Sequence, residues 1–185
     1  MDKAIPRLEK GIIQIYFGNG KGKTTAAIGQ AIRALGQGLR IYMSQFLKPM
    51  DAFSGEMAIF EGFKDHFFFR RPNHSCFLEN PLTDIEMEKE KSLILDEIAS
   101  IRECFHRSLF DIFILDELLT ALNLRMIEES HIIDLLKTKA EHVEIVLTGL
   151  KSTPKISDMA DLVTEMRLIK HPYQSGLKAR QGIEY

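Results

Sequence analysis

A glycine-rich segment at residues 18–25 restricts this chain to few folds. It follows a β-rich run at residues 11–17 and precedes helix formers with apolar spacing at residues 23–35, so it lies between a strand and a helix. A phosphate-binding loop takes that position, because its backbone N–H groups and the helix N-terminus both attract an anion. The predicted ATP-binding and phosphate-binding residues here are Gly18, Asn19, Gly20, Lys21, Gly22, Lys23, Thr24 and Thr25.

Two side chains of this loop have specific chemistry. Lys23 can reach phosphate oxygens, and the Thr24 hydroxyl can ligate Mg²⁺. The loop departs from the common GxxxxGK[ST] pattern, because Phe17 stands where that pattern has glycine. The loop is effectively one residue short, and a shorter cradle could hold a triphosphate in another register than hydrolases use. The sequence therefore argues against assuming attack at the γ-phosphate.

The alternation of predicted elements indicates the fold class. Residues 1–185 are predicted to form one domain, with a short N-terminal segment at 1–10 and a long functional loop at 47–82, which is rich in proline and glycine. We predict an α/β fold, with an open, mostly parallel sheet covered by helices on both faces, in the P-loop NTP-binding (RecA-like) architecture. The expected strands lie at 11–17, 39–46, 110–115, 143–148 and 162–169, and the expected helices at 23–35, 83–108, 128–140 and 156–160.

Composition narrows the class of partner. The net charge of −2 gives no broad basic field, so no nucleic acid partner is expected. No stretch has the eighteen or so apolar residues of a membrane helix, so we expect a cytoplasmic protein that does not contact the membrane. Cys76 and Cys104 are the only cysteines, and the grouping of Cys76 with His66 and His74 matches no standard metal-ligand spacing.

A second candidate element is an acidic pair that follows an apolar run. Residues 110–115 predict a central strand, and Asp116 and Glu117 come directly after it. This pattern resembles a Walker B element, although acids after a strand also cap helices. Next to the phosphate loop, the pair predicts a Mg²⁺ site formed by Thr24, Asp116 and Glu117.

Three consecutive aromatic residues occur within the long central segment. Side chains alternate along an extended chain, so Phe67, Phe68 and Phe69 cannot all face one core, and at least one is free to line a ligand pocket. Arg70 and Arg71 follow; they suit an anionic ligand, although a solvated pair of charges is their ordinary fate.

The sequence resembles the ATP:corrinoid adenosyltransferases of the bacterial cob(I)alamin type, whose short phosphate loop has the same eight residues. The resemblance covers nearly the whole chain outside the central loop. Its further motifs are Arg33-Ala34-Leu35-Gly36, Gln45-Phe46-Leu47-Lys48, Leu115-Asp116-Glu117-Leu118, Leu147-Thr148-Gly149, the run at 160–166, Lys170-His171-Pro172-Tyr173 and Gly182-Ile183-Glu184-Tyr185.

The resemblance implies transfer of the 5′-deoxyadenosyl group of ATP to the cobalt of a reduced corrinoid, such as cobalamin, with Mg²⁺ as cofactor and triphosphate as leaving group. Co(I) is itself a strong nucleophile, so no catalytic nucleophile is expected from the protein. The resemblance also implies adenosylcobalamin synthesis or salvage, a homodimer, and an electron donor, for which a flavoprotein is one candidate.

Residue roles follow from the resemblance position by position. It assigns phosphate and metal contacts to Lys23 and Thr24, the metal to Glu117 with Asp116 nearby, and nucleotide binding to Asn19 and Arg33. It also implies aromatic residues that face the corrinoid, here Phe67, Phe68 and Phe69. The chain departs from the family in lacking tryptophan and in having Leu150 where many relatives have arginine.

Two other functions fit a phosphate loop. A P-loop ATPase or kinase would use Glu117 to orient water or substrate at the γ-phosphate. A nucleotide-dependent binding protein would instead deliver a finished cofactor without turnover. Product analysis separates all three classes.

Overall fold

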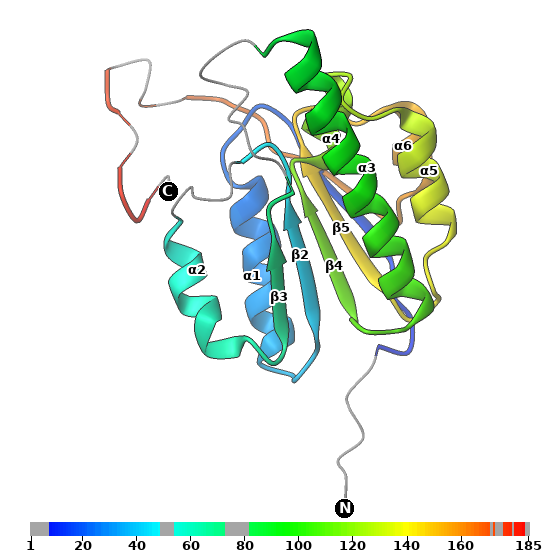
Figure 1. Cartoon of the computed structure of the whole chain (residues 1–185). Helices are drawn as coiled ribbons and strands as arrows, with labels where there is room; N and C mark the ends of the chain where they lie inside the picture. Colours follow the sequence, from blue (N-terminus) through cyan, green and yellow to red (C-terminus); the bar gives the residue numbers. More distant parts are fainter. Residues whose placement is uncertain are drawn as a thin grey trace, which may run out of the picture.

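A six-stranded sheet forms the centre of the protein (Figure 1). The computed structural model describes residues 8–48, 54–72, 82–170, 172, 176–178 and 180–183. The strand order is β3-β2-β4-β5-β1-β6, and every pair of neighbours is parallel. The strands are β1 (Ile13–Phe17), β2 (Ile41–Gln45), β3 (Phe67–Arg70), β4 (Ile112–Asp116), β5 (Glu144–Gly149) and β6 (Leu162–Glu165). The predicted α/β class is confirmed, and the mostly parallel sheet is parallel throughout.

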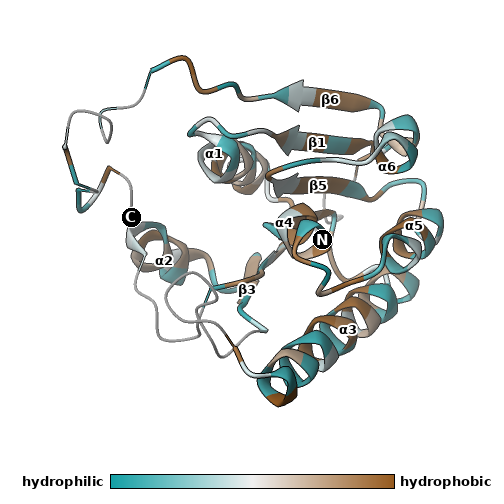
Figure 2. Cartoon of the chain, turned by 90° about the horizontal axis from the view of Figure 1, so that it is seen from above, coloured by the Kyte–Doolittle hydropathy of each residue, from teal (hydrophilic) through white to brown (hydrophobic). Residues whose placement is uncertain are grey.

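Helices cover both faces of the sheet, as the view from above in Figure 2 shows. Helices α1 and α2 pack on one face, and the larger set formed by α3, α4, α5 and α6 packs on the other. The helices are α1 (Lys23–Leu35), α2 (Gly55–Phe60), α3 (Asp84–His106), α4 (Leu118–Asn123), α5 (Glu129–Lys137) and α6 (Pro154–Met159), with a 3₁₀ turn, η1 (Glu61–Phe63), after α2.

The alternation of side chains along β2 explains the two layers of core. Ile41 and Met43 point into the cluster under α1, whereas Tyr42 between them points into the cluster under α3. All five residues of β2 and all five of β4 are buried, as expected for central strands of a parallel sheet. Apolar burial on both faces holds the strands in place. Because the strands are parallel, their carboxyl ends lie together at one edge of the sheet.

Helix boundaries follow local capping signals. Helix α3 begins after Thr83, whose hydroxyl accepts from the Glu86 N–H while the Glu86 carboxylate accepts from the Thr83 N–H at 2.8 Å. This capping box confirms the predicted helix start. Helix α1 spans the residues predicted for it.

The central segment contains more regular structure than its composition predicts. Of the expected loop at 47–82, the described part contains α2, η1 and β3, so the prediction of a continuous loop was wrong for residues 55–63 and 67–70. Strand β3 pairs in parallel with β2, with Phe67 opposite Ile41 and Phe69 opposite Met43. Tertiary pairing at the sheet edge overrides the weak local signal of a four-residue run. Helix α4, which directly follows β4, was also not predicted.

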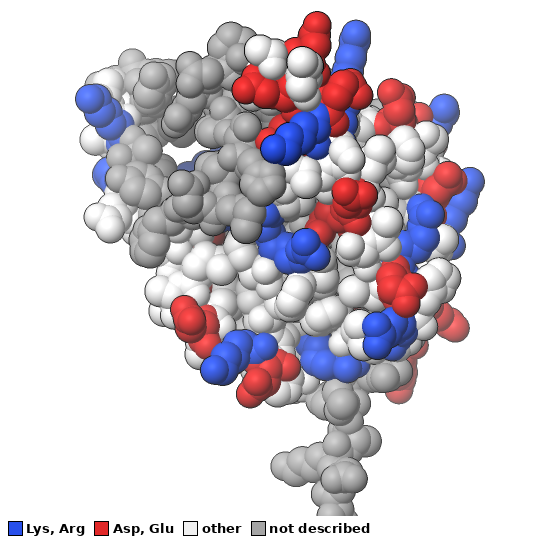
Figure 3. Space-filling view, in the orientation of Figure 1, with Lys and Arg blue, Asp and Glu red and all other residues white. Residues whose placement is uncertain are grey.

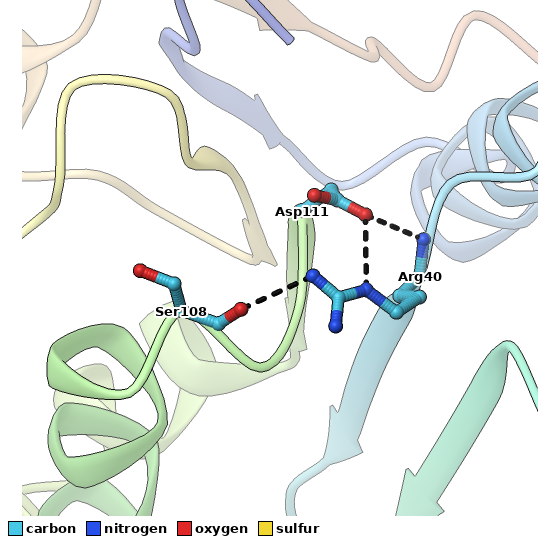
Figure 4. Close-up of polar contacts among 3 residues, drawn as sticks. All are labelled: Arg40, Ser108 and Asp111. Carbon is cyan, nitrogen blue, oxygen red and sulfur yellow. Dashed lines mark hydrogen bonds and ion pairs between the residues drawn. The ribbon is translucent and has the colours of Figure 1, made fainter. Parts of the chain in front are cut away.

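At the amino ends of the strands, an ionic contact joins the residue before β2, Arg40, to the residue before β4, Asp111 (Figure 4). The buried Asp111 carboxylate accepts from the Arg40 backbone N–H at 2.8 Å and lies 3.5 Å from the guanidinium Nε. The same guanidinium donates to the Ser108 carbonyl at 3.1 Å. The contact joins the turn after α3 to the beginning of β2, far along the strands from the phosphate loop.

A buried carboxylate attaches α3 to the edge of the sheet. Glu97 is 2% exposed and accepts from the Tyr42 hydroxyl at 2.8 Å, and its other oxygen lies 3.4 Å from Arg70 Nε. Burial and the nearby Glu97 charge both raise the pKa of Tyr42, so the phenol stays a donor. Glu97 therefore links α3 to β2 and to the end of β3.

We expect Glu97→Ala to lower the free energy of unfolding by about 2–3 kcal/mol, because it leaves the buried Tyr42 hydroxyl without its acceptor and Arg70 without its counter-ion. Urea denaturation followed by circular dichroism measures this loss. Glu103→Ala on the exposed side of the same helix is the control and should change stability by less than about 0.5 kcal/mol. Equal losses for the two variants would refute the role of Glu97.

The visible surface has mixed charge. Figure 3 shows acidic and basic side chains interspersed over the face that carries α3, in keeping with the net charge of −2. None of the described helices combines the length and apolar character that a membrane crossing requires.

Candidate functional site

The predicted phosphate loop, residues 18–25, lies at the carboxyl end of β1 and leads into α1. Gly18 and Gly22 have φ of 120° and 117°, values that residues with a Cβ rarely adopt. A Cβ at Gly18 would also lie 2.3 Å from the Met166 carbonyl oxygen. The Lys23 ammonium donates to the carbonyls of Gly18 and Gly20 at 2.9 and 3.0 Å, which places a cation at the centre of the loop.

The segment after β6, residues 166–168, forms hydrogen bonds with the loop. The Gly20 N–H donates to the Met166 carbonyl at 2.7 Å, and the Asn19 side-chain oxygen accepts from the Leu168 N–H at 2.9 Å. The Asn19 side chain thus joins the loop to the segment after β6, and this contact holds the loop in place. The sequence patterns did not predict this support, because residues 166–168 carry no phosphate-loop motif.

Asp116 is the most densely hydrogen-bonded acid of the site. It ends β4, is fully buried, and its Oδ1 accepts from the hydroxyls of Thr24 at 2.9 Å and Thr148 at 2.6 Å. Its Oδ2 accepts from the side-chain amide of Gln45 at 2.9 Å. The pairing of Gln45 with Asp116 across β2 and β4, and the position of Thr148 in β5, bring these groups to one edge. The Thr24 hydroxyl donates to the acid and so keeps its lone pairs free for a cation.

Glu117 lies beside Asp116 in a left-handed backbone conformation, with φ of 63°. Its N–H donates to the Thr148 hydroxyl at 2.9 Å, and its carboxylate accepts from the Thr120 hydroxyl. Burial raises the pKa of Glu117 and the Asp116 charge adds to this, whereas the Thr120 hydrogen bond and the charges of Lys23 and Lys48 oppose it. The two acids are thus held in different environments.

The residues of this edge have the chemistry of a hard-cation site. A hydroxyl and two carboxylates are oxygen donors of the kind that Mg²⁺ prefers, and Mg²⁺ is often bound by one or two carboxylates together with substrate phosphates. Within the described ranges, no group of three or more His, Cys, Asp or Glu side chains forms a metal-binding cluster. His74 and Cys76 lie outside the described residues.

A cavity of about 380 Å³ adjoins the loop. Its lining combines the start of α1, the start of α2 and the C-terminal part of the chain. The lining residues are Thr24, Thr25, Ile28, Lys48, Ser54, Gly55, Glu56, Gly182 and Ile183. Lys48 and Glu56 give this cavity charges of both signs beside the phosphate loop.

Two predicted nucleotide-binding residues, Arg33 and Lys21, have contacts outside the loop. Arg33 is in the last turn of α1, about 15 Å along the helix axis from Lys23, and lines a separate cavity with Leu8 and Glu144. The structure therefore does not bring Arg33 to the phosphate loop of the same chain. Lys21 is exposed, and its ammonium donates to the Ile183 carbonyl at 2.8 Å.

The three phenylalanines separate as their alternation predicts. Phe67 is buried and stacks on Phe60 at 3.8 Å between ring centroids, so it lines no described cavity. Phe68 points to the other face, where its ring lies 5.1 Å from that of Tyr42. Phe69 is half-buried, with the guanidinium of Arg71 5.2 Å from its ring centroid. These residues belong to a strand and not to the predicted loop.

Comparison with known proteins identifies the family. Residues 9–185 match the family described as ATP:corrinoid adenosyltransferase BtuR/CobO/CobP. A corrinoid adenosyltransferase of Sinorhizobium sp. is 35% identical over 96% of this chain and 81% of its own length. Corrinoid adenosyltransferases of Pseudomonas aeruginosa and Salmonella typhimurium are 30% and 31% identical, over 97% and 96% of this chain and 86% and 87% of their own lengths. The chain therefore belongs to the ATP:corrinoid adenosyltransferase family.

Proposed function

We propose that this protein transfers the 5′-deoxyadenosyl group of ATP to the Co(I) of a reduced corrinoid and releases triphosphate. Membership of the family supports the reaction class. The observation that carries the proposal is the short phosphate loop in which Lys23 lies centrally and Thr24 contacts the acid that ends β4. Such a loop binds a triphosphate without offering a protein nucleophile.

The transfer is a nucleophilic substitution at C5′ of ATP. The cobalt of the substrate supplies the electron pair that forms the bond to C5′, and the bond from C5′ to the phosphate oxygen breaks with its electrons going to triphosphate. Cobalt is thereby oxidised formally from Co(I) to Co(III). The protein contributes position and charge, since it must hold the triphosphate while C5′ faces the metal.

The residues of the loop would bind the leaving group. Lys23 and the backbone N–H groups of residues 21–25 would donate to phosphate oxygens, and this requires Lys23 to exchange its carbonyl partners for phosphate. Thr24, Asp116 and Glu117 would hold Mg²⁺ at the same edge. Bound there, Mg²⁺ would neutralise charge on the triphosphate.

The corrinoid is expected next to the ribose end of the nucleotide. Of the three phenylalanines, Phe69 is the one we assign to a corrinoid contact, because Phe67 is covered by Phe60. Phe68 is 44% exposed, but it lies beside Tyr42 on the face that α3 covers, whereas the cavity next to the loop is lined by α1 and α2. We further propose a cytoplasmic homodimer that receives its electron from a reductase, with a flavoprotein as one candidate, and that has neither a nucleic acid nor a membrane partner.

Product analysis tests this function. Incubation of the protein with MgATP and chemically reduced cob(I)alamin should give adenosylcobalamin and triphosphate in equal amounts, measured by absorbance and by ion chromatography. Incubation with MgATP alone should release little phosphate. Steady formation of ADP without corrinoid would identify an ATPase or kinase, and tight binding of both ligands without turnover would identify a binding protein.

A further inference from the structure

A row of polar side chains crosses the carboxyl edge of the sheet and ends at a buried arginine. Arg71 directly follows β3, and its Nε donates to the side-chain oxygen of Gln45 at 2.9 Å. The Gln45 amide donates in turn to Asp116 at 2.9 Å, and Asp116 also accepts from Thr24. The row therefore connects the edge strand of the sheet to the threonine of the phosphate loop.

Arg71 is buried more completely than a surface charge would be. It is 8% exposed, its terminal nitrogen donates to the buried Ser54 hydroxyl at 3.0 Å, and its guanidinium lies 5.2 Å from the Phe69 ring centroid. Burial lowers the pKa of Arg71, while the charges of Glu56 and Asp116 oppose this. Removing a guanidinium from water is costly, so its hydrogen bonds must be well directed.

The guanidinium determines which way the Gln45 amide faces. A guanidinium has donors only, so it must face the amide oxygen of Gln45, and this leaves the amide NH₂ facing Asp116. In the flipped orientation, the amide oxygen would face the carboxylate of Asp116, and two acceptors would repel each other. Since Gln45 and Asp116 are both fully buried, water cannot relieve that conflict.

We propose that Arg71 is a positioning residue for the cation site, acting through Gln45 to hold the Asp116 carboxylate in the rotamer that meets Thr24. This inference rests on the proposed function, because it assigns the Thr24–Asp116 edge to the cation that accompanies ATP. The Gln45 amide bridges Arg71 and Asp116, so the orienting effect of the guanidinium passes through this amide. The contact of Arg71 with Ser54 extends the same row to the wall of the 380 Å³ cavity.

The neighbouring arginine provides a matched control. Arg70 points to the opposite face of the sheet, where its Nε lies 3.4 Å from Glu97, and about half of its side chain is exposed. Arg70→Met removes the same chemical group one residue away. It should lower stability by weakening the contact with α3, and it leaves the row at the carboxyl edge intact.

The test measures ATP binding by isothermal titration calorimetry over a series of MgCl₂ concentrations, without corrinoid. Arg71→Met is expected to raise the Mg²⁺ concentration for half-maximal ATP binding about tenfold, the lower end of the effect of groups that orient metal ligands. Arg71→Lys keeps the charge but cannot bridge Gln45 and Ser54 with a planar fork, so it should resemble Arg71→Met. Arg70→Met should leave this Mg²⁺ concentration unchanged.

A double-mutant cycle isolates the route through the amide. In a Gln45→Leu background, Arg71→Met should have no further effect on the Mg²⁺ requirement. A shift of less than about twofold in a folded Arg71→Met protein, wild-type behaviour of Arg71→Lys, or an equal shift in Arg70→Met would each overturn the proposal. Melting temperatures identify unfolded variants. Failure of adenosyl transfer by the wild-type protein would refute the proposed function while leaving this binding test decisive for Arg71.

Discussion

Asp116→Asn is expected to lower kcat for adenosyl transfer by about 1000-fold, the upper range for loss of one preorganised charge-stabilising group. The carboxylate of Asp116 accepts from Thr24, Thr148 and Gln45, and all three are donors. An asparagine has a single acceptor oxygen, so in this fully buried position it can accept either from the Gln45 amide or from the two hydroxyls, but not from all three. It also lacks the negative charge that a cation at this edge requires.

Steady-state kinetics with MgATP and reduced cob(I)alamin measure this loss. Because the loss of part of this buried set of hydrogen bonds also costs about 1–3 kcal/mol of stability, a urea titration must accompany the kinetics. Asp134→Asn, at an exposed position of α5, makes the same chemical change away from the site and should leave kcat within about twofold. An unaltered kcat in a folded Asp116→Asn protein would show that Asp116 does not belong to the site.

Lys23→Ala is expected to weaken ATP binding about 100-fold while the protein stays folded. The ammonium of Lys23 lies at the centre of the loop on the carbonyls of Gly18 and Gly20, and charge-assisted hydrogen bonds to phosphate are among the strong polar contacts. The side chain is only half-buried and contributes little to the core, so the loss of stability should be below about 1 kcal/mol. Calorimetric titration with MgATP measures the affinity.

Lys21→Ala provides the contrast, because both lysines belong to the same loop. The Lys21 ammonium donates to the Ile183 carbonyl at 2.8 Å, whereas the Lys23 ammonium donates to carbonyls of the loop itself. Its removal should weaken ATP binding no more than about threefold, in the range of an exposed charged contact. Similar losses for the two variants would mean that the loop binds phosphate through overall charge and that Lys23 has no special place.

Elements with a strong local signal were predictable from the sequence, including five short strands, whereas α2, β3 and α4 were not. Helix α1 and the capped start of α3 have strong local signals, namely apolar spacing and the pairing of Thr83 with Glu86. Strand β3 is only four residues long, and it lies in a segment whose prolines and glycines suggest a loop. Pairing with β2 stabilises it, and a partner strand distant in sequence leaves no local pattern.

The candidate site also contains residues that the sequence pointed to and residues that it did not. The predicted phosphate loop and the Asp116–Glu117 pair are patterns of adjacent residues, so both could be singled out from the amino-acid sequence, and the fold brings Thr24 of the loop to Asp116. Arg33 was assigned to the nucleotide by resemblance alone, and the helix geometry of α1 places it at the far end from the loop. Gln45 and Thr148 belong to motifs of the family resemblance, but no pattern assigned them to the site, because their role comes from contact with Asp116 across neighbouring strands.

The α/β class, the position of the phosphate loop and the family could all be inferred from the amino-acid sequence, because each depends on residues that are close together along the chain. Three other features emerge only once the chain is folded: Met166 and Leu168 support the loop, Phe67 is buried, and Arg71 reaches the site through Gln45. These contacts depend on the order of strands in the sheet, which local physical chemistry does not specify and only the packing of both faces selects.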